Sequence, residues 1–190
     1  MTYSKRTLGI IVLSVMVTLG GIIGWLWLHG NRVITPFRPA DRAAIITILN
    51  EDWQILVAEG SDFSAEYMLD HMAADYHYPD NSLSIVVCRE QGKVVGFITY
   101  HLLDGFHGRI QFLAIARGYR GRGYGGRLMQ HAMEDMRSQG VCFIELVTRI
   151  SNEPARALYR KLGFVERWYE GDFVGFSVSL CRDMVPGFVS

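Results

Sequence analysis

Apolar positions after about residue 33 recur with the periods of strands and helices. Alternating and β-branched apolar runs predict strands at 33–38, 83–89, 94–102, 109–116, 141–148, 164–170 and 173–181. Apolar spacing of three and four predicts helices from Asp41 to about Asn50, at 125–139, and after Asn152, with a less regular helical stretch at 51–80. The resulting order, βα(α)βββαβαββ, predicts a mixed α/β fold: a meander, a βαβ crossover and a closing hairpin.

Polar residues at the predicted helix ends support these boundaries. Asp41 is expected to cap the first helix, because a short carboxylate can accept from free backbone N–H groups. Asn152 or Ser151 is expected to cap the last helix, which has Pro154 in its first turn and Gly163 just past its end.

The N-terminal part of the chain has no such periodicity. Residues 8–28 are uncharged, and as a helix they would extend roughly 30 Å, the hydrocarbon thickness of a bilayer. A secretory signal peptide usually has a shorter apolar core and an Ala-x-Ala-like site, and a buried helix usually keeps a polar face. We therefore expect a membrane anchor at 1–32, followed by one domain at 33–190.

Overall composition is that of a folded protein. Nineteen Lys and Arg balance nineteen Asp and Glu, and 49% of the residues are hydrophobic, which excludes a disordered chain and gives no general argument for a nucleic-acid partner. Cys88, Cys142 and Cys181 fall in predicted strands and are expected to be buried, reduced thiols. Without a Cys/His cluster, no metal is expected.

Charges are nevertheless segregated along the chain. Between Ala43 and Cys88 there are eight acidic residues and no Lys or Arg, whereas Arg117–Arg127 contains four arginines and no acid. One surface is therefore expected to attract cations and another anions, although a solvated helical face explains the acidic tract equally well.

A glycine-rich turn joins the predicted strand at 109–116 to the following helix. Its glycines lie at positions 118, 121, 123, 125 and 126. Glycines permit positive φ and close backbone approach, so consecutive N–H groups can converge on an oxyanion at the start of the helix. This arrangement suits a phosphate or pyrophosphate.

Two phosphate-binding patterns fit this turn poorly. The pair Gly118 and Gly123 has the glycine spacing of a P-loop. A P-loop, however, has Lys and then Ser or Thr after its second glycine, whereas Gly123 is followed by Tyr124 and Gly125. Gly121-x-Gly123-x-x-Gly126 matches the dinucleotide pattern, with Glu145 about 20 residues further on. However, Glu145 lies within a predicted strand rather than at its end, and the preceding meander is not typical of a doubly wound sheet.

Two separate segments resemble the GNAT superfamily of acyl-CoA N-acyltransferases. Residues Arg120–Gly125 are similar to its Gln/Arg-x-x-Gly-x-Gly/Ala signature for coenzyme A, and Asn152–Phe164 to its Asn-x-x-Ala-x-x-Leu-Tyr-x-x-x-Gly-Phe segment. The resemblance extends over roughly 33–181 and implies direct transfer of an acetyl group from acetyl-CoA to a primary amine.

The resemblance also implies site residues. The expected cofactor-binding residues are Leu113, Ala114 and Ile115 on the strand edge, Arg120, Gly121, Arg122, Gly123, Tyr124 and Gly125 in the turn, and Asn152. Tyr159 matches the family's tyrosine acid, which protonates the departing thiolate. Gln111 and Val147 stand where some relatives carry a glutamate base, so Glu145 is the candidate base, with a water relay left open.

The expected partners follow from this activity. The acceptor amine would be a cationic small molecule or a protein amine, and Gly20 and Gly24 have the spacing that packs two membrane helices together, which leaves a homodimer open. The domain is expected on the cytoplasmic side of the membrane, where acetyl-CoA is found. The alternatives are a non-catalytic module that binds coenzyme A or a partner, and a dinucleotide-binding protein.

Overall fold

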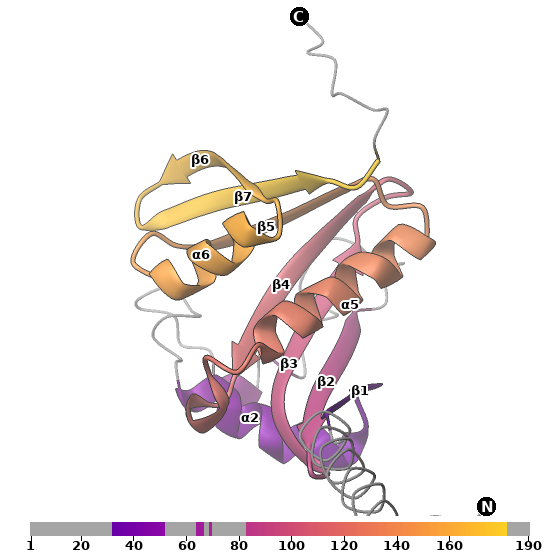
Figure 1. Cartoon of the computed structure of the whole chain (residues 1–190), viewed down its shortest axis with the longest axis vertical. Helices are drawn as coiled ribbons and strands as arrows, with labels where there is room; N and C mark the ends of the chain where they lie inside the picture. Colours follow the sequence, from indigo (N-terminus) through magenta and orange to yellow (C-terminus); the bar gives the residue numbers. More distant parts are fainter. Residues whose placement is uncertain (1–31, 52–63, 67–68, 70–82, 182–190) are drawn as a thin grey trace, which may run out of the picture.

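The computed structural model describes residues 32–51, 64–66, 69 and 83–181, which form one mixed sheet with helices on both faces (Figure 1). The strands are β1 (Arg32–Pro36), β2 (Ser84–Glu90), β3 (Lys93–Leu102), β4 (His107–Ile115), β5 (Phe143–Arg149), β6 (Val165–Glu170) and β7 (Phe173–Ser179), in the spatial order β1-β2-β3-β4-β5-β7-β6. The helices are α2 (Arg42–Glu51), α5 (Tyr124–Ser138) and α6 (Glu153–Lys161), with short 3₁₀ turns η1 (Pro39–Asp41) and η2 (Arg117–Tyr119).

The sheet is split between β4 and β5. These strands are parallel, whereas all other neighbouring strands in the sheet are antiparallel. Their pairing begins at His107 with Phe143 and ends at Arg109 with Glu145, although β4 continues to Ile115 and β5 to Arg149. Beyond this point, the facing edges of both strands have no strand partner in the described part of the chain.

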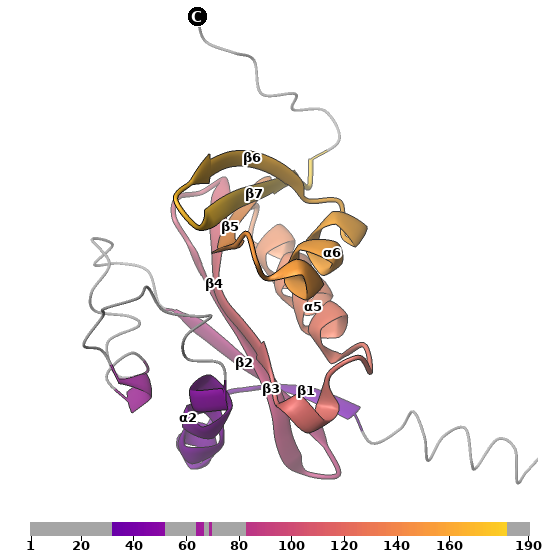
Figure 2. The same cartoon turned by 90° about the vertical axis from the view of Figure 1, so that its left-hand side faces the viewer.

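The helices cover opposite faces of the sheet. Figure 2 shows α2 on one side and both α5 and α6 on the other. The α5 face buries Leu128, Met129, Ala132 and Met136 against the strands, as their helical spacing predicts. A separate apolar cluster joins Ile45, Ile48 and Leu49 of α2 to the other face. The two clusters hold β4 between them.

The predicted strands and helices within the described residues are confirmed, with ends displaced by one or two residues. The mixed sheet, in which only β4 and β5 are parallel, also excludes the doubly wound fold of a dinucleotide-binding domain. The predicted helical region at 51–80 lies mostly outside the described residues.

The structure changes the two side-chain caps predicted from the sequence. Asp41 ends η1, and its buried carboxylate accepts hydrogen bonds from the Arg38 backbone N–H (2.9 Å) and from Arg89 (2.7 Å). Asn152 is at the N-terminal boundary of α6 but makes no side-chain cap, and its Nδ2 donates to Thr148 Oγ1 at 3.3 Å. The Asp41 side chain thus closes a capping box at η1, just before α2, and also binds the distant Arg89.

The predicted membrane localisation is also corrected. In the parts of the chain that the structure describes, no helix has the length and apolar character needed to cross a bilayer. Residues 8–28, on which that prediction depended, lie outside the described residues.

Two of the three cysteines differ from the predicted reduced state. Cys142, just before β5, forms a disulfide with Cys181, just after β7, while Cys88 is a buried thiol. Because β5 and β7 are antiparallel neighbours, residues 39 apart in sequence meet at one end of the sheet. The bond ties the C-terminal hairpin to the crossover strand.

Thiol counting tests this bond. Protein purified without reductant and unfolded in denaturant should react with one equivalent of a thiol reagent, from Cys88, and with three after reduction. Replacing Cys142 with Ser should lower the free energy of unfolding by about 2–4 kcal/mol, because the unfolded chain loses a cross-link. Three reactive thiols before reduction would contradict the disulfide.

Candidate active site

The start of α5 leaves several backbone N–H groups without a carbonyl partner. Gly123 precedes the helix with φ +83, a left-handed conformation that favours glycine, and no side chain caps the helix. The first backbone bond of the helix runs from the Arg127 N–H to the Gly123 carbonyl at 3.2 Å. Among the described residues, the N–H groups of Gly121, Gly123, Gly125 and Gly126 meet no backbone carbonyl. Uncapped N–H groups at a helix N-terminus are a site for an anion.

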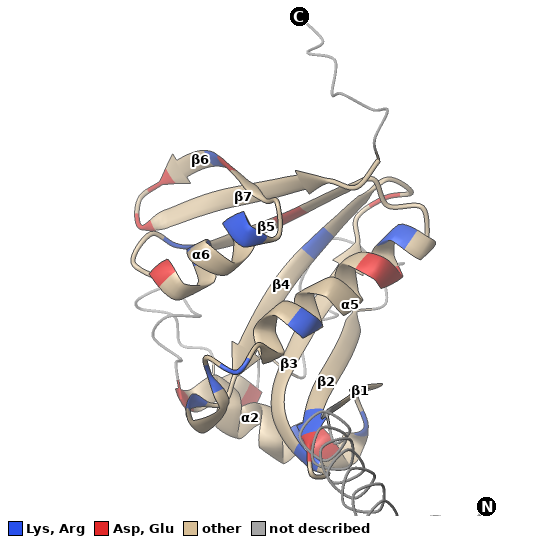
Figure 3. Ribbon diagram, viewed as in Figure 1, with Lys and Arg blue, Asp and Glu red and all other residues tan. Residues whose placement is uncertain are grey.

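The arginines of the turn contact the protein itself. Arg120 donates from Nε to the Ile115 carbonyl at 2.8 Å, and its guanidinium lies 3.8 Å from Glu51. Arg122 lies 3.8 Å from Glu90 and 5.2 Å from the ring centre of Tyr119. Figure 3 shows Lys and Arg positions, in blue, along the turn between β4 and α5. The two arginines therefore brace the turn, whose backbone N–H groups are left available to an anion.

Glu51 and Glu90, which lie outside the predicted site, are two acidic side chains that hold the turn. Glu51, the last residue of α2, accepts the Arg117 backbone N–H at 2.6 Å. Glu90 accepts a hydrogen bond from the hydroxyl of Tyr124, whose ring is buried in the core. These contacts span 66 and 34 positions of sequence, so no local pattern could have indicated them.

The predicted strand-edge residues lie where β4 has separated from β5. Leu113 and Ile115 pack toward the α5 face, and Ala114 is buried in the cluster with α2. All three pair with β3 on one side, whereas β5 has left the other side after Arg109. An extended ligand could add to this open edge as a strand.

Tyr159 on α6 is buried, with 7% of its surface exposed. Its ring lies 5.5 Å from that of Phe176 in an edge-to-face arrangement and 6.1 Å from that of Phe164. Burial disfavours the phenolate and raises the pKa of Tyr159 to about 12. The phenol therefore keeps its proton at neutral pH.

Glu145 and Val147 lie on the face of β5 opposite to Leu146, which packs into the core with α5. Glu145 accepts a hydrogen bond from Arg109 Nε at 2.7 Å, so its carboxylate is ion-paired. Gln111 occupies a bulge in β4, and within the described residues its buried Oε1 has no hydrogen-bond partner. Val147 follows Glu145 on the same face and is 45% exposed.

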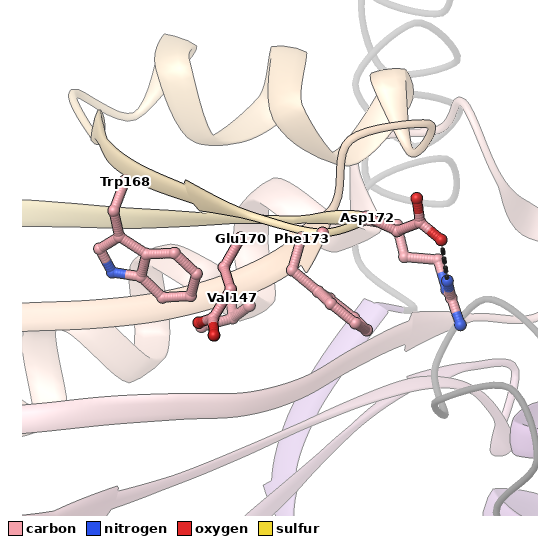
Figure 4. A pocket seen from close by; sticks show the side chains of 7 residues that line it. Val147, Trp168, Glu170, Asp172 and Phe173 are labelled. Carbon is pink, nitrogen blue, oxygen red and sulfur yellow. Dashed lines mark ion pairs between the residues drawn. The ribbon is translucent and has the colours of Figure 1, made fainter.

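Two neighbouring cavities lie on this face. One, of about 540 Å³, is formed by β5 and the β6–β7 hairpin, including Val147, Trp168, Glu170, Asp172 and Phe173 (Figure 4). The other, of about 450 Å³, contains Arg109 and Glu145 and shares Val147 and Trp168 with the first. In the described residues, no group of three or more His, Cys, Asp or Glu is placed to hold a metal ion.

Comparison with protein families agrees with this arrangement. Residues 42–164, more than half of the chain, match the model of the acetyltransferase (GNAT) family. The matched region contains α2, strands β2 to β5 with the split between β4 and β5, the glycine-rich turn, α5 and α6. This chain belongs to the GNAT acetyltransferase family.

Individual relatives match over shorter stretches. The chain is 37% identical over 78 residues to N-alpha-acetyltransferase MAK3 of Arabidopsis thaliana, covering 40% of this chain and 41% of that protein. It is 35% identical over 78 residues to the [ribosomal protein bS18]-alanine N-acetyltransferase of Escherichia coli, covering 40% of this chain and 51% of the relative. The matched part thus spans about half or less of each relative.

Solved structures share the fold. The PaiA N-acetyltransferase of Thermoplasma acidophilum, solved in complex with coenzyme A, has a TM-score of 0.65 at 16% identity. That match covers 78% of this chain and 98% of the solved chain. At this identity the likeness establishes the fold alone.

The buried phenol generates a test at alkaline pH. An unfolded tyrosine ionises near pH 10, whereas Tyr159 in the folded protein ionises near pH 12. Below both values the two states are equally protonated, and between them only the unfolded state loses its proton. Stability should therefore fall as pH rises through this window, by up to about 3 kcal/mol from this residue.

Urea unfolding at about pH 9 and about pH 11 measures this loss. Tyr159→Phe should lose less stability than wild type over that interval, because its side chain cannot ionise. Equal losses in the two proteins would contradict the raised pKa.

Proposed function

We propose that this protein is an N-acetyltransferase that transfers the acetyl group of acetyl-CoA directly to a primary amine. One observation carries the proposal: the uncapped N-terminus of α5 adjoins the end of a β4 edge that β5 leaves open. The first feature suits a diphosphate, and the second suits an extended amide-containing arm. Coenzyme A joins these two groups in one molecule.

The cofactor residues are assigned on this basis. The diphosphate binds the backbone N–H groups between Gly121 and Gly125, with Arg120 and Arg122 holding the turn in place. The pantetheine arm lies along Leu113, Ala114 and Ile115, where a backbone N–H polarises the thioester carbonyl. Asn152 lies between the end of β5 and the start of α6, and its amide contacts the arm.

The reaction requires two proton movements. The neutral amine attacks the thioester carbonyl carbon, and the carbon–sulfur bond breaks as the new amide forms. The acceptor nitrogen loses a proton, and the departing thiolate gains one from the phenol of Tyr159. The tyrosine is then reprotonated by solvent before the next turnover.

Glu145 is the candidate acceptor of the amine proton. Its carboxylate lines the cavity beside the split, where Arg109 donates a hydrogen bond to it. Arg109 therefore competes with the amine for contact with this carboxylate, so water in the cavity takes part of the proton removal. Gln111 cannot accept a proton as a base in this role.

The acceptor that we propose is the N-terminal amine of a protein. Support comes from the relatives, one named as an N-alpha-acetyltransferase and one as an alanine N-acetyltransferase acting on ribosomal protein bS18. The β6–β7 hairpin adds the carboxylates of Glu170 and Asp172 to the cavity. These charges favour the approach of an ammonium group.

Calorimetry with coenzyme A tests the cofactor site. Gly123→Ala should weaken binding about tenfold, because a left-handed alanine costs about 1–2 kcal/mol and the turn must shift its N–H groups. Gly92→Ala is the matched control, since Gly92 has φ +78 and equally open surroundings in the β2–β3 turn. It should lose similar stability but keep its affinity.

Equal affinity of Gly123→Ala and wild type for coenzyme A would contradict this placement of the diphosphate. Binding of NAD without binding of coenzyme A would instead favour a dinucleotide site.

Turnover of acetyl-CoA with N-terminal peptides tests the acid. Tyr159→Phe should lower kcat by about a hundredfold or more, because the thiolate loses its proton donor, whereas Glu145→Gln should lower it by less than about tenfold. Wild-type activity in Tyr159→Phe would remove the tyrosine from the mechanism. Coenzyme A binding with no turnover by wild type would favour a non-catalytic module.

A further inference from the structure

An apolar strip crosses the sheet beside the split. Val147 of β5 is in register with Gly175 of β7, which is in register with Trp168 of β6. Val147 and Trp168 are 45% and 44% exposed, large fractions for apolar side chains. Both line the two cavities described above, so the strip forms their common wall.

Gly175 provides the space in which the Trp168 indole lies. A Cβ atom at position 175 would stand 2.1 Å from Cε2 and 2.3 Å from Nε1 of the indole, closer than any real contact allows. The ring therefore covers the backbone of β7 and extends across the gap toward Val147. An indole held against backbone offers a large apolar surface at little cost in side-chain entropy.

The next row of residues, toward the turn of the β6–β7 hairpin, carries charged side chains at the rim of the cavity. Phe173 is in register with Glu170 on one side and with Arg149 on the other, and the Arg149 guanidinium lies 5.0 Å from the Phe173 ring centre. Arg149 is also 3.7 Å from Asp172, and Glu170 makes no ion pair with any described residue. Figure 4 shows Trp168, Val147, Glu170 and Phe173 directed to one side of the hairpin.

The strip lies close to the proposed reaction centre. Val147 and Arg149 belong to the part of β5 that continues beyond its last pair with β4, Glu145 with Arg109. Their side chains also face away from α6. Side chains alternate along β5, and Leu146, the residue before Val147, packs on the opposite face into the core with Tyr159. A chain bound over Trp168 would therefore reach the split from the side opposite α5 and α6.

We infer that Trp168, seated on Gly175, selects acceptors that carry a large apolar side chain next to the reacting amine. This inference rests on the proposed function and names its substrate class: a polypeptide N-terminus that begins with Leu, Met or Phe. The first side chain packs on Trp168 and Val147, while the carboxylates at the rim attract the ammonium group. An alanine side chain is too short to cover the strip, and a polyamine has no apolar branch to place there.

Acetylation of peptides that differ only in their first residue tests the selection. The full chain with acetyl-CoA should give a kcat/KM at least about tenfold higher for peptides beginning with Leu, Met or Phe than with Ala or Ser, because of the apolar area covered. Mass spectrometry of the peptide measures the product without interference from protein thiols.

Substitutions in the apolar strip test whether it determines this preference for the first residue. Trp168→Ala should reduce the ratio of kcat/KM for Leu over Ala to within about threefold, while Trp168→Phe keeps most of it. Gly175→Ala should also reduce the ratio, because the new methyl group displaces the indole. Tyr169→Ala is the matched control, since Tyr169 is an exposed aromatic of the same strand that lines neither cavity, and it should keep the wild-type ratio.

The outcomes separate this inference from the proposed function. Turnover of all peptides at similar kcat/KM, an unchanged ratio in Trp168→Ala, or faster turnover of spermidine than of any peptide would overturn the inference alone. No turnover of any amine by wild type, although coenzyme A binds, would overturn the proposed function and the inference with it.

Discussion

Beyond the three residue pairs from His107 with Phe143 to Arg109 with Glu145, β4 and β5 do not pair, and the sheet opens. Parallel strands that separate expose backbone N–H and C=O groups on both edges, and such groups require a partner when water is excluded. The cluster on the α5 face holds both halves of the sheet, so the opening persists without unfolding. The strand edge, the turn before α5 and the cavities beside β5 all take their positions from this separation.

In the turn before α5, charged side chains hold the backbone in place and the backbone N–H groups stay available to a ligand. Its arginines were candidates for direct contact with an anion, yet Glu51 and Glu90 engage them from α2 and from the β2–β3 hairpin. These contacts hold a glycine-rich segment that would otherwise lose much conformational entropy on ordering. The backbone N–H groups can then face a ligand without reorganisation, which is the condition for strong binding of a diphosphate.

Much of the fold could be predicted because its elements have clear local periodicity. Alternation predicted the meander and the closing hairpin, and the spacing of Leu128, Met129, Ala132 and Met136 predicted α5. The two GNAT-like segments indicated the turn and the α6 region, since glycine spacing and helix starts are local properties. The predicted cap by Asn152 was wrong, and Asp41 caps the 3₁₀ turn before α2 while it also binds Arg89, a contact 48 positions away that no local pattern indicates.

By itself the sequence determined the order of strands and helices, the glycine-rich turn and the family resemblance, since each depends on residues close together in the chain. Only the tertiary structure decided where the sheet splits, that Cys142 bonds to Cys181, that Arg109 occupies Glu145, and that the indole of Trp168 lies on Gly175. Each of these features depends on the register in which neighbouring strands pair, and no local pattern encodes that register. Register follows from how all the strands pack together, so it appears only when the whole sheet is assembled.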